Sequence, residues 1–247
     1  MPEAKTEAET YAAERTALRN ERPVHSLQPV WTAVDDYFGG LLAPGDQALD
    51  AALAANAQAG LPPIDVTRLQ GKLLAVLAHL TRARRILEIG TLGGYSTIWL
   101  ARAAGPEGRV VTLEFNPLHA EVARANLRNA GVLDRVELRQ GRALDSLAAL
   151  AAERPQPFDL IFIDADKAGN TEYFQWSLQL ARPGTAIVVD NVVRDGKVVE
   201  AGTDDKDVEG VRRFAKALAA EPRVTAAAVQ TVGAKGYDGF VLAVVLP

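Results

Sequence analysis

The chain has 247 residues, of which 48% are hydrophobic and 23% charged, with a formal net charge of −4. This length suits one large α/β domain, and interspersed charges leave no basic surface for nucleic acid. The absence of cysteine excludes disulfides and cysteine-ligated zinc and suits the cytoplasm. No apolar run approaches the ~20 residues of a membrane span, so we expect a small-molecule substrate and neither a nucleic-acid nor a membrane partner.

The expected organisation is a single domain behind a short arm. Residues 1–22 are rich in charge and alanine with little apolar periodicity, which predicts a flexible arm. Residues 23–247 form the domain, with 23–65 as a helical extension and 66–247 as a Rossmann-like core.

Two amphipathic segments of the extension predict helices that pack outside a sheet. They span residues 30–38 and 46–57, and glycine and proline pairs separate them. Aromatic side chains at helical spacing most often belong to the core, and this is the expectation for Trp31, Tyr37 and Phe38.

A third helix is expected from Val66 to Leu80. Its apolar residues recur at helical spacing and mark the buried side as Leu69, Leu73, Leu74, Val76, Leu77 and Leu80. His79 in the same helix is expected to be packed and not to bind a ligand.

An apolar strand that ends in a glycine-rich turn follows at residues 85–96. Its sequence is Arg-Ile-Leu-Glu-Ile-Gly-Thr-Leu-Gly-Gly-Tyr-Ser, and a helix starts near Thr97. A continuous apolar run suits a strand covered on both faces, and glycines let the backbone approach a ligand closely. The stretch therefore predicts a nucleotide-like cofactor across the turn.

Two residues of this stretch favour S-adenosylmethionine over NAD. The dinucleotide fingerprint needs a second glycine against the pyrophosphate, and Leu92 occupies that position. Glu88 at the strand end could accept hydrogen bonds from the ammonium of a methionine moiety. An NAD-dependent dehydrogenase and a non-catalytic cofactor-binding protein stay as alternatives.

The next strand, residues 109–113, ends in Glu114, where an acid could bind both hydroxyls of a ribose. Asn116 and Pro117 then make a helix start, and Gly131 ends that helix. His119 on this helix is expected to be exposed.

Further strands alternate with helices. This alternation predicts an α/β fold with a mostly parallel, doubly wound sheet of seven strands and helices on both faces. The remaining strands are expected at 135–139, 158–163, 185–189, 224–232 and 240–246, and the remaining helices at 171–180 and 208–219. After the third strand, the small side chain of Ala143 would leave room for an adenine ring.

Two strand ends carry acids that could meet at one point. The fourth strand ends in Asp164-Ala165-Asp166-Lys167, and the fifth ends in Asp190-Asn191. Ligands of such sheets bind outside the carboxyl ends of the strands. Oxygen ligands alone suit Mg²⁺, with Mn²⁺ or Ca²⁺ as alternatives. Either acid alone could instead cap the following helix.

Together these motifs resemble the cation-dependent O-methyltransferases of the caffeoyl-CoA and catechol type. The resemblance runs from about Val66 to Val245, and more weakly from Trp31. The motifs that carry it are Leu87-Glu88-Ile89-Gly90 with Gly94-Tyr95-Ser96, Ile163-Asp164-Ala165-Asp166-Lys167, and Val189-Asp190-Asn191-Val192.

The resemblance implies a class I S-adenosylmethionine-dependent methyltransferase that assembles as a homodimer. It implies metal binding by Asp164, Asp190 and Asn191, general-base catalysis by Lys167, and participation of Asp164 in catalysis. It implies cofactor binding by Val66, Glu88, Gly90, Thr91, Ser96, Glu114, Ala143, Asp164 and Asp166.

The chemistry favours a vicinal diphenol as the methyl acceptor. A phenol has a pKa of about 10, and a divalent cation that contacts its oxygen makes the phenolate available near neutrality. A second, adjacent hydroxyl would let the substrate chelate the cation. Plant members often carry Leu-Trp after the Asp-Asn pair, where this chain has Val193-Arg194. The acceptor is therefore not defined by the resemblance, and a coenzyme A ester stays open.

Overall fold

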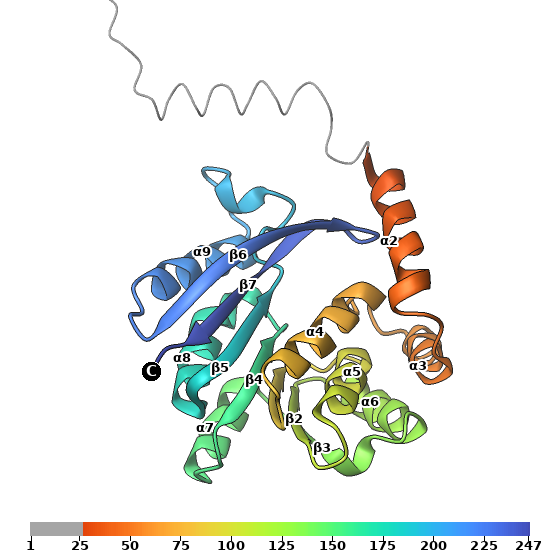
Figure 1. The fold of residues 1–247 in the computed structure, drawn as a ribbon. Coiled ribbons are helices and arrows are strands. Elements are labelled where there is room, and N and C mark those ends of the chain that lie inside the picture. Colours follow the sequence, from red (N-terminus) through yellow and green to blue (C-terminus); the bar gives the residue numbers. More distant parts are fainter. Residues whose placement is uncertain (1–26) are drawn as a thin grey trace, which may run out of the picture.

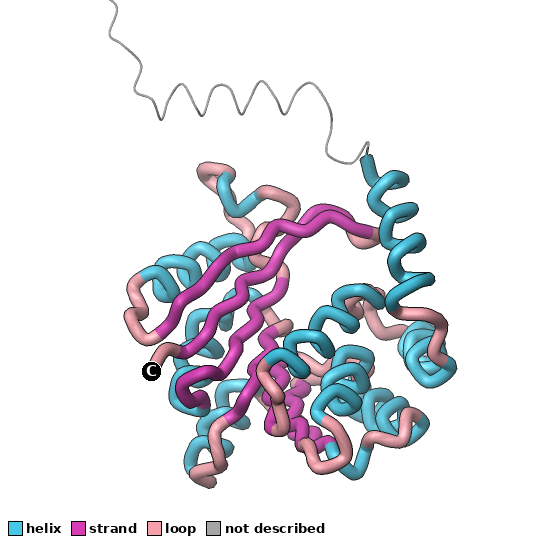
Figure 2. Tube along the Cα trace, in the orientation of Figure 1, coloured by secondary structure: helices cyan, strands magenta, loops and turns pink. Residues whose placement is uncertain are grey.

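The computed structural model describes residues 27–247, so the arm predicted at 1–22 lies outside the described residues. In the described part, a seven-stranded sheet lies between two groups of helices (Figures 1 and 2). No helix of this part is long and apolar enough to cross a membrane.

The sheet has the strand order β3-β2-β1-β4-β5-β7-β6, in which β7 runs antiparallel to β5 and β6 and all other neighbours are parallel. This confirms the predicted α/β class and the mostly parallel sheet. The winding direction reverses between β1 and β4, which creates the position where such sheets bind ligands. The strands are β1 (Arg85–Ile89), β2 (Arg109–Glu114), β3 (Val136–Gln140), β4 (Phe158–Ile163), β5 (Ala181–Asp190), β6 (Val224–Gly233) and β7 (Gly236–Val245).

Helices cover both faces of the sheet, and each face has its own apolar core. Successive residues of a strand point to opposite faces: Ile86 packs in one core and Leu87 in the other. The first core includes residues of α3 (Gln47–Gln58), α4 (Arg68–Leu80), α5 (Tyr95–Ala104) and α6 (Pro117–Asn129), and the second includes residues of α7 (Ala143–Ala152), α8 (Asn170–Leu180) and α9 (Lys206–Ala219). Short 3₁₀ turns occur at Leu133–Arg135, Lys167–Gly169 and Lys197–Val199.

Helix α2 (Gln28–Leu42) differs from the prediction in length and burial. It continues through Gly39 and Gly40, because glycine lowers helix propensity by only about 1 kcal/mol, and ends before Pro44, which disfavours helical backbone at the preceding residue. The expectation of a core position was wrong for Tyr37 and Phe38, which are 65% and 46% exposed.

The contacts of α2 explain this exposure. The amide of Gln28 donates to the carbonyl of Gly233 at 2.8 Å, and the backbone N–H of Ala234 donates to Asp35 at 2.8 Å. These bonds attach α2 to the tip of the β6–β7 hairpin, which reaches the helix in Figure 1. They use polar side chains, and the apolar residues Val30, Val34, Tyr37 and Leu41 on the helix remain exposed.

Helix α4 also buries a narrower side than predicted. It begins at Arg68, since Thr67 and Gln70 form a capping box that places Val66 before the helix. Leu74 and Leu77 are buried, but Leu73, Val76 and Leu80 are exposed, as is His79. The prediction that these four residues are packed was therefore wrong.

Three strand starts differ from the prediction. β3 starts at Val136 because the 3₁₀ turn precedes it, and β5 starts at Ala181, directly after α8. β7 starts at Gly236, which has a φ of +96° and closes a tight hairpin from Gly233. Glycine is suited to this backbone conformation.

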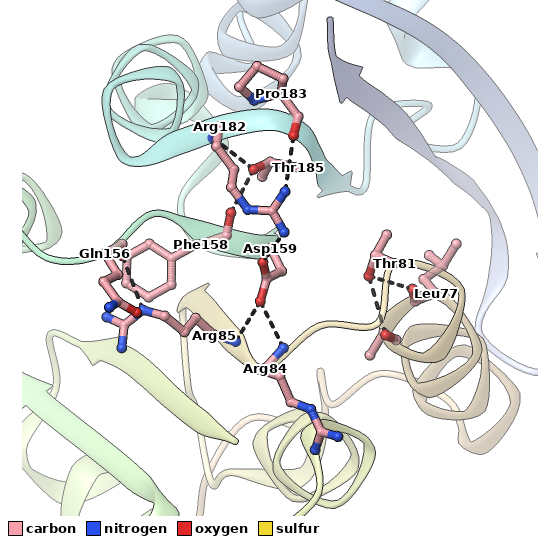
Figure 3. Close-up of polar contacts among 11 residues, drawn as sticks. Leu77, Thr81, Arg84, Arg85, Gln156, Phe158, Asp159, Arg182, Pro183 and Thr185 are labelled. Atoms are coloured by element: carbon pink, nitrogen blue, oxygen red, sulfur yellow. Dashed lines mark hydrogen bonds and ion pairs between the residues drawn. The ribbon is translucent and has the colours of Figure 1, made fainter. Parts of the chain in front are cut away.

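Asp159 joins the amino ends of three neighbouring strands, β1, β4 and β5 (Figure 3). Its Oδ2 accepts from the backbone N–H groups of Arg84 and Arg85 at 2.8 and 2.9 Å, and its Oδ1 accepts from Arg182 at 2.5 Å. Burial alone would raise the pKa of Asp159, but these hydrogen bonds hold that pKa below its usual range. The carboxylate thereby aligns the starts of β1, β4 and β5.

Glu88 joins β1, β2 and α5 inside the molecule. It is fully buried and accepts hydrogen bonds from the hydroxyls of Ser96 at 2.6 Å, Thr97 at 2.5 Å and Thr112 at 2.7 Å. Thr112 has a single hydroxyl proton and gives it to Glu88, so Thr91, whose Oγ1 lies 2.6 Å from that of Thr112, must be the donor in their bond. Glu88 thus also orients Thr91.

Burial raises the pKa of Glu88 to about 7, although the three hydroxyl bonds act in the opposite direction. A folded-state pKa above the unfolded value means that this group contributes stability below about pH 4.5 and loses it as the pH rises through about 7. Glu88→Gln cannot ionise. We therefore compare the free energies of unfolding of the cofactor-free variant and the parent. As the pH rises from 5 to 8, the difference should shift in favour of the variant by up to about 3 kcal/mol. Urea unfolding across this range measures the difference. A difference that stays constant with pH would contradict the raised pKa.

Candidate active site

The carboxyl ends of the central strands border one cavity of about 780 Å³. It lies where the winding direction reverses, as expected for this sheet type. Most residues singled out from the sequence line it: Val66, Gly90, Thr91, Ser96, Glu114, Ala143, Asp164, Asp166, Lys167 and Asn191. Glu88 and Asp190 do not line it, because both are buried behind its wall, with 0% and 6% of their surfaces exposed.

The glycines of the loop after β1 are required by close contacts with other parts of the protein, as well as by the space that a ligand would need. A Cβ at Gly90 would lie 2.1 Å from the carbonyl oxygen of Asp164, and one at Gly93 would lie 1.9 Å from the amide oxygen of Asn56. Gly94 has a φ of +84° and caps α5. The loop therefore fits tightly against the end of β4, and Gly90 lets the glycine loop and Asp164 lie side by side.

Glu114 at the end of β2 organises the other side of this loop. Its Oε2 accepts from the backbone N–H groups of Thr91 and Leu92 at 3.2 and 2.8 Å. Its Oε1 lies 3.5 Å from the ring nitrogen Nδ1 of His119. His119 lines the cavity and its side chain is only 18% exposed, so the expectation of an exposed histidine was wrong.

Lys167 and Asp164 form a close pair in the cavity wall. The ammonium of Lys167 donates to Oδ1 of Asp164 at 2.8 Å, and Lys167 is 6% exposed. A Cβ at Gly210 of α9 would lie 2.2 Å from the carbonyl oxygen of Lys167, so glycine allows α9 to pack directly on the turn that carries the lysine. The pair is fixed by packing and faces a ligand space.

Asp190 lies beside this pair on the neighbouring strand. Burial, and then the carboxylate of Asp164, raise the pKa of Asp190 above its usual range. Asn191 follows with a left-handed backbone, φ +62°, and is one of the residues that line the cavity. Two carboxylates that repel each other and one amide make a donor set of oxygens alone.

This donor set fits a hard divalent cation such as Mg²⁺, which prefers oxygen ligands. In residues 27–247 no three His, Cys, Asp or Glu side chains gather into a group that could hold a metal. The candidate set therefore depends on Asn191 as its third ligand, beside Asp164 and Asp190. The mutual repulsion of the two acids is what a cation at this position would relieve.

Asp166 has a partner that the sequence did not indicate. The hydroxyl of Tyr173, one turn into α8, donates to Oδ1 of Asp166 at 2.5 Å, and the backbone N–H of Gly169 donates to Oδ2 at 2.9 Å. Burial and the bond to Asp166 raise the pKa of Tyr173. The motif Asp-x-Asp-Lys could have suggested the acid's place but not this tyrosine.

Asp65 also lines the cavity and was missed, because it precedes α4 in a proline-containing loop without a motif. Burial raises its pKa, and the amide of Asn56 donates to its Oδ1 at 2.9 Å. Lys235, at the tip of the β6–β7 hairpin, donates to the backbone carbonyl of Asp65. The hairpin thus reaches the wall of the cavity.

Known proteins share this architecture. The family model described as O-methyltransferase matches residues 45–244. The chain is similar to a catechol O-methyltransferase of Mycobacterium tuberculosis, 56% identical over 218 residues that cover 88% of this chain and 97% of the relative. A catechol O-methyltransferase of Niastella koreensis is 51% identical over 216 residues, which cover 87% and 98%.

The chain is also similar to a solved structure of an O-methyltransferase. The crystal structure of the O-methyltransferase from Bacillus cereus in complex with SAH has a TM-score of 0.87 and 56% identity, and the match covers 88% of this chain and 99% of that chain.

These matches span nearly the whole described chain at more than half identity to three proteins with methyltransferase names. They decide against the two alternative functions, an NAD-dependent dehydrogenase and a non-catalytic cofactor-binding protein. The chain belongs to the O-methyltransferase family and is an O-methyltransferase.

Proposed function

We propose that this enzyme transfers a methyl group from S-adenosylmethionine to one hydroxyl of a small vicinal diphenol and needs a divalent cation to do so. One observation carries the proposal: the glycine loop, Glu114, Lys167 and the oxygen donors after β4 and β5 all border a single cavity. Names of the relatives agree with the acceptor class.

The cofactor would lie across the glycine loop, with its ribose at Glu114. SAH, bound in the Bacillus cereus relative, is the product that remains when S-adenosylmethionine loses its methyl group. Ala143 and Asp166 line the same cavity. Ala143 would leave room for the adenine, and Asp166 would lie beside the cofactor. Glu88 would act from behind the wall, through Ser96 and Thr91, which line the cavity.

Removal of the Glu114 carboxylate should weaken cofactor binding. Each charge-assisted hydrogen bond is worth about 1.5–3 kcal/mol, so Glu114→Ala should bind S-adenosylmethionine about tenfold or more weakly by calorimetry. Glu114 also holds the N–H groups of Thr91 and Leu92, so the unfolding temperature of the free variant serves as the control for loop damage. Unchanged affinity would remove Glu114 from the cofactor site.

The acceptor would bind next to Asp164, Asn191 and Lys167. A bound divalent cation lowers the pKa of a hydroxyl that contacts it and so supplies the phenolate near neutral pH. Asp164 and Asn191 line the cavity, and the buried Asp190 beside them would supply the third ligand oxygen. Lys167 would take the hydroxyl proton at Nζ as a general base, for which it must be in its neutral amine form. Its Nζ lies 2.8 Å from Oδ1 of Asp164, which supports this role.

Chelator should abolish methyl transfer, and Mg²⁺ or Mn²⁺ should restore it. Asp190→Asn keeps the side-chain shape but removes a charge, so it should lose most activity while it still binds S-adenosylmethionine.

Lys167→Met should lower kcat by about 10²–10⁴, the usual contribution of a positioned general base. Single-turnover kinetics with labelled methyl donor measures these losses. Full activity of metal-free protein, verified by elemental analysis, would contradict the cation-dependent mechanism.

We also propose a homodimer that forms through α2. Four exposed apolar residues, the α2 stripe, follow one side of the helix at the spacing of a helix–helix seam: Val30, Val34, Tyr37 and Leu41, with exposures of 58, 49, 65 and 63%. Exposed apolar stripes of this kind commonly mark protein interfaces. A second copy would cover the stripe symmetrically.

Light scattering at micromolar concentration should give twice the chain mass of 26.4 kDa. Val34→Glu with Tyr37→Glu should give the monomer, because two charges would enter the seam. Leu80→Glu, which changes a residue that is 74% exposed on α4, is the matched control and should stay dimeric. A monomeric parent protein would overturn the proposal.

A cytoplasmic location and the division of the domain at residue 65 stay predictions. The absence of cysteine supports the first. The second has the support of the helix bounds: α2 and α3 end before residue 65, and α4 and β1 begin after it.

A further inference from the structure

Two buried amide side chains connect two segments of the cavity wall. Asn56 belongs to α3 and Asn126 to α6, helices that lie beside each other in Figure 1, and the residues are 3% and 2% exposed. The Nδ2 of Asn126 donates to Oδ1 of Asn56 at 2.9 Å and to the backbone carbonyl of Gly93 at 2.8 Å. The Nδ2 of Asn56 donates to Oδ1 of Asp65 at 2.9 Å. These three bonds, the amide relay, lead from the loop before α4 to the glycine loop.

The two ends of the amide relay fix the direction of every bond in it. An ionised carboxylate and a backbone carbonyl can only accept, so Asn56 must turn its Nδ2 to Asp65. Its Oδ1 then faces Asn126, whose Nδ2 donates to that oxygen and to the carbonyl of Gly93. A Cβ on Gly93 would lie 1.9 Å from the same oxygen, so glycine lets the loop reach the relay. Only one arrangement of the two side chains satisfies these bonds.

Local structure gives no reason for asparagine at either position. Asparagine is a weaker helix former than alanine, which flanks Asn56 on both sides and precedes Asn126. A buried amide also costs free energy unless its hydrogen bonds are made. The reason lies in what the pair joins. Asp65 lines the cavity next to Val66, which also lines it, and Gly93 belongs to the glycine loop.

We propose that Asn56 and Asn126 are positioning residues for the cofactor. The amide relay holds the loop before α4 at a fixed distance from the glycine loop, and the methionine end of S-adenosylmethionine binds between the two. This inference rests on the proposed function, with the cofactor across the glycine loop and Val66 among its contacts. Neither asparagine lines the cavity, so both act through the segments that they join. Loss of the relay weakens cofactor binding and leaves the reaction of the bound cofactor unchanged.

Asn126→Asp keeps the shape of the side chain and removes both donors. Its carboxylate oxygens would face Oδ1 of Asn56 and the carbonyl of Gly93, so two attractions become repulsions. Calorimetry should show SAH binding about tenfold or more weaker than to the parent, at unchanged stoichiometry. Asn126→Ala breaks the same bonds without a buried charge and should shift the affinity in the same direction. Asn129→Asp, at an exposed position of the same helix, is the matched control and should bind SAH as the parent does.

Reversal of one bond separates positioning from general damage. Asn56→Asp places a carboxylate against that of Asp65 and should weaken SAH binding about tenfold or more. Asp65→Asn alone keeps an acceptor oxygen for Asn56. In the double variant, the new asparagine at position 65 donates to the new aspartate at position 56, so the bond returns in the opposite direction. The double variant should therefore regain the affinity of Asp65→Asn, a non-additivity that a double-mutant cycle measures.

The division of the effect between kcat and KM gives a readout that loss of folded protein does not produce. With catechol as acceptor and Mg²⁺ at saturation, Asn126→Ala should raise the KM for S-adenosylmethionine about tenfold or more, while kcat stays within about threefold of the parent. A variant that only contains less folded protein would lower kcat at unchanged KM.

Three results would overturn the role of the amide relay. Asn126→Ala might bind SAH as tightly as the parent, the losses of Asn56→Asp and Asp65→Asn might simply add, or Asn129→Asp might weaken binding as strongly. Failure of the proposed function gives a different result, a parent that binds SAH but methylates no diphenol. Calorimetry with SAH needs no turnover and decides the role of the relay in that case as well.

Discussion

The site depends on the parallel pairing of β1 with β4. Ile89 lies opposite Ile163 in this pair, so the two strands end together and their following residues meet. The backbone N–H of Asp164 donates to the carbonyl of Ile89 at 2.8 Å, and only a glycine fits at position 90 against the carbonyl of Asp164. The glycine loop and Asp164 are adjacent because the sheet register makes them so.

The acids around the cavity are arranged in two layers. Asp164, Asp166 and Glu114 face the ligand space, while Glu88 and Asp190 are buried behind it. Burial raises the pKa of both hidden acids, but their partners differ. Glu88 has three hydroxyl donors that satisfy it, whereas Asp190 faces another carboxylate. The first arrangement suits an internal support of the loop, and the second suits a site completed by a cation.

Much of this could be predicted from the sequence, because the signals are local. Residues 85–89 and 158–163 are mostly apolar. Glu88 lies near the carboxyl end of the first segment and Asp164 directly follows the second, and a parallel sheet brings these two ends together. The remainder depends on contacts between distant residues. Lys235 reaches the carbonyl of Asp65 across 170 positions, and no periodicity indicates such a bond. The exposure of Tyr37 and the burial of His119 likewise depend on what each helix packs against, and α7 had no distinct start in its run of alanine and leucine.

The central claim is that cofactor loop and metal ligands serve one reaction centre, and a crystal of the SAH complex grown with Mn²⁺ tests it most directly. Anomalous scattering should show one strong peak within coordination distance of oxygens from Asp164, Asp190 and Asn191, on the side of the cavity away from Glu114. The absence of a peak there, in crystals of protein that is active in Mn²⁺, would contradict the account.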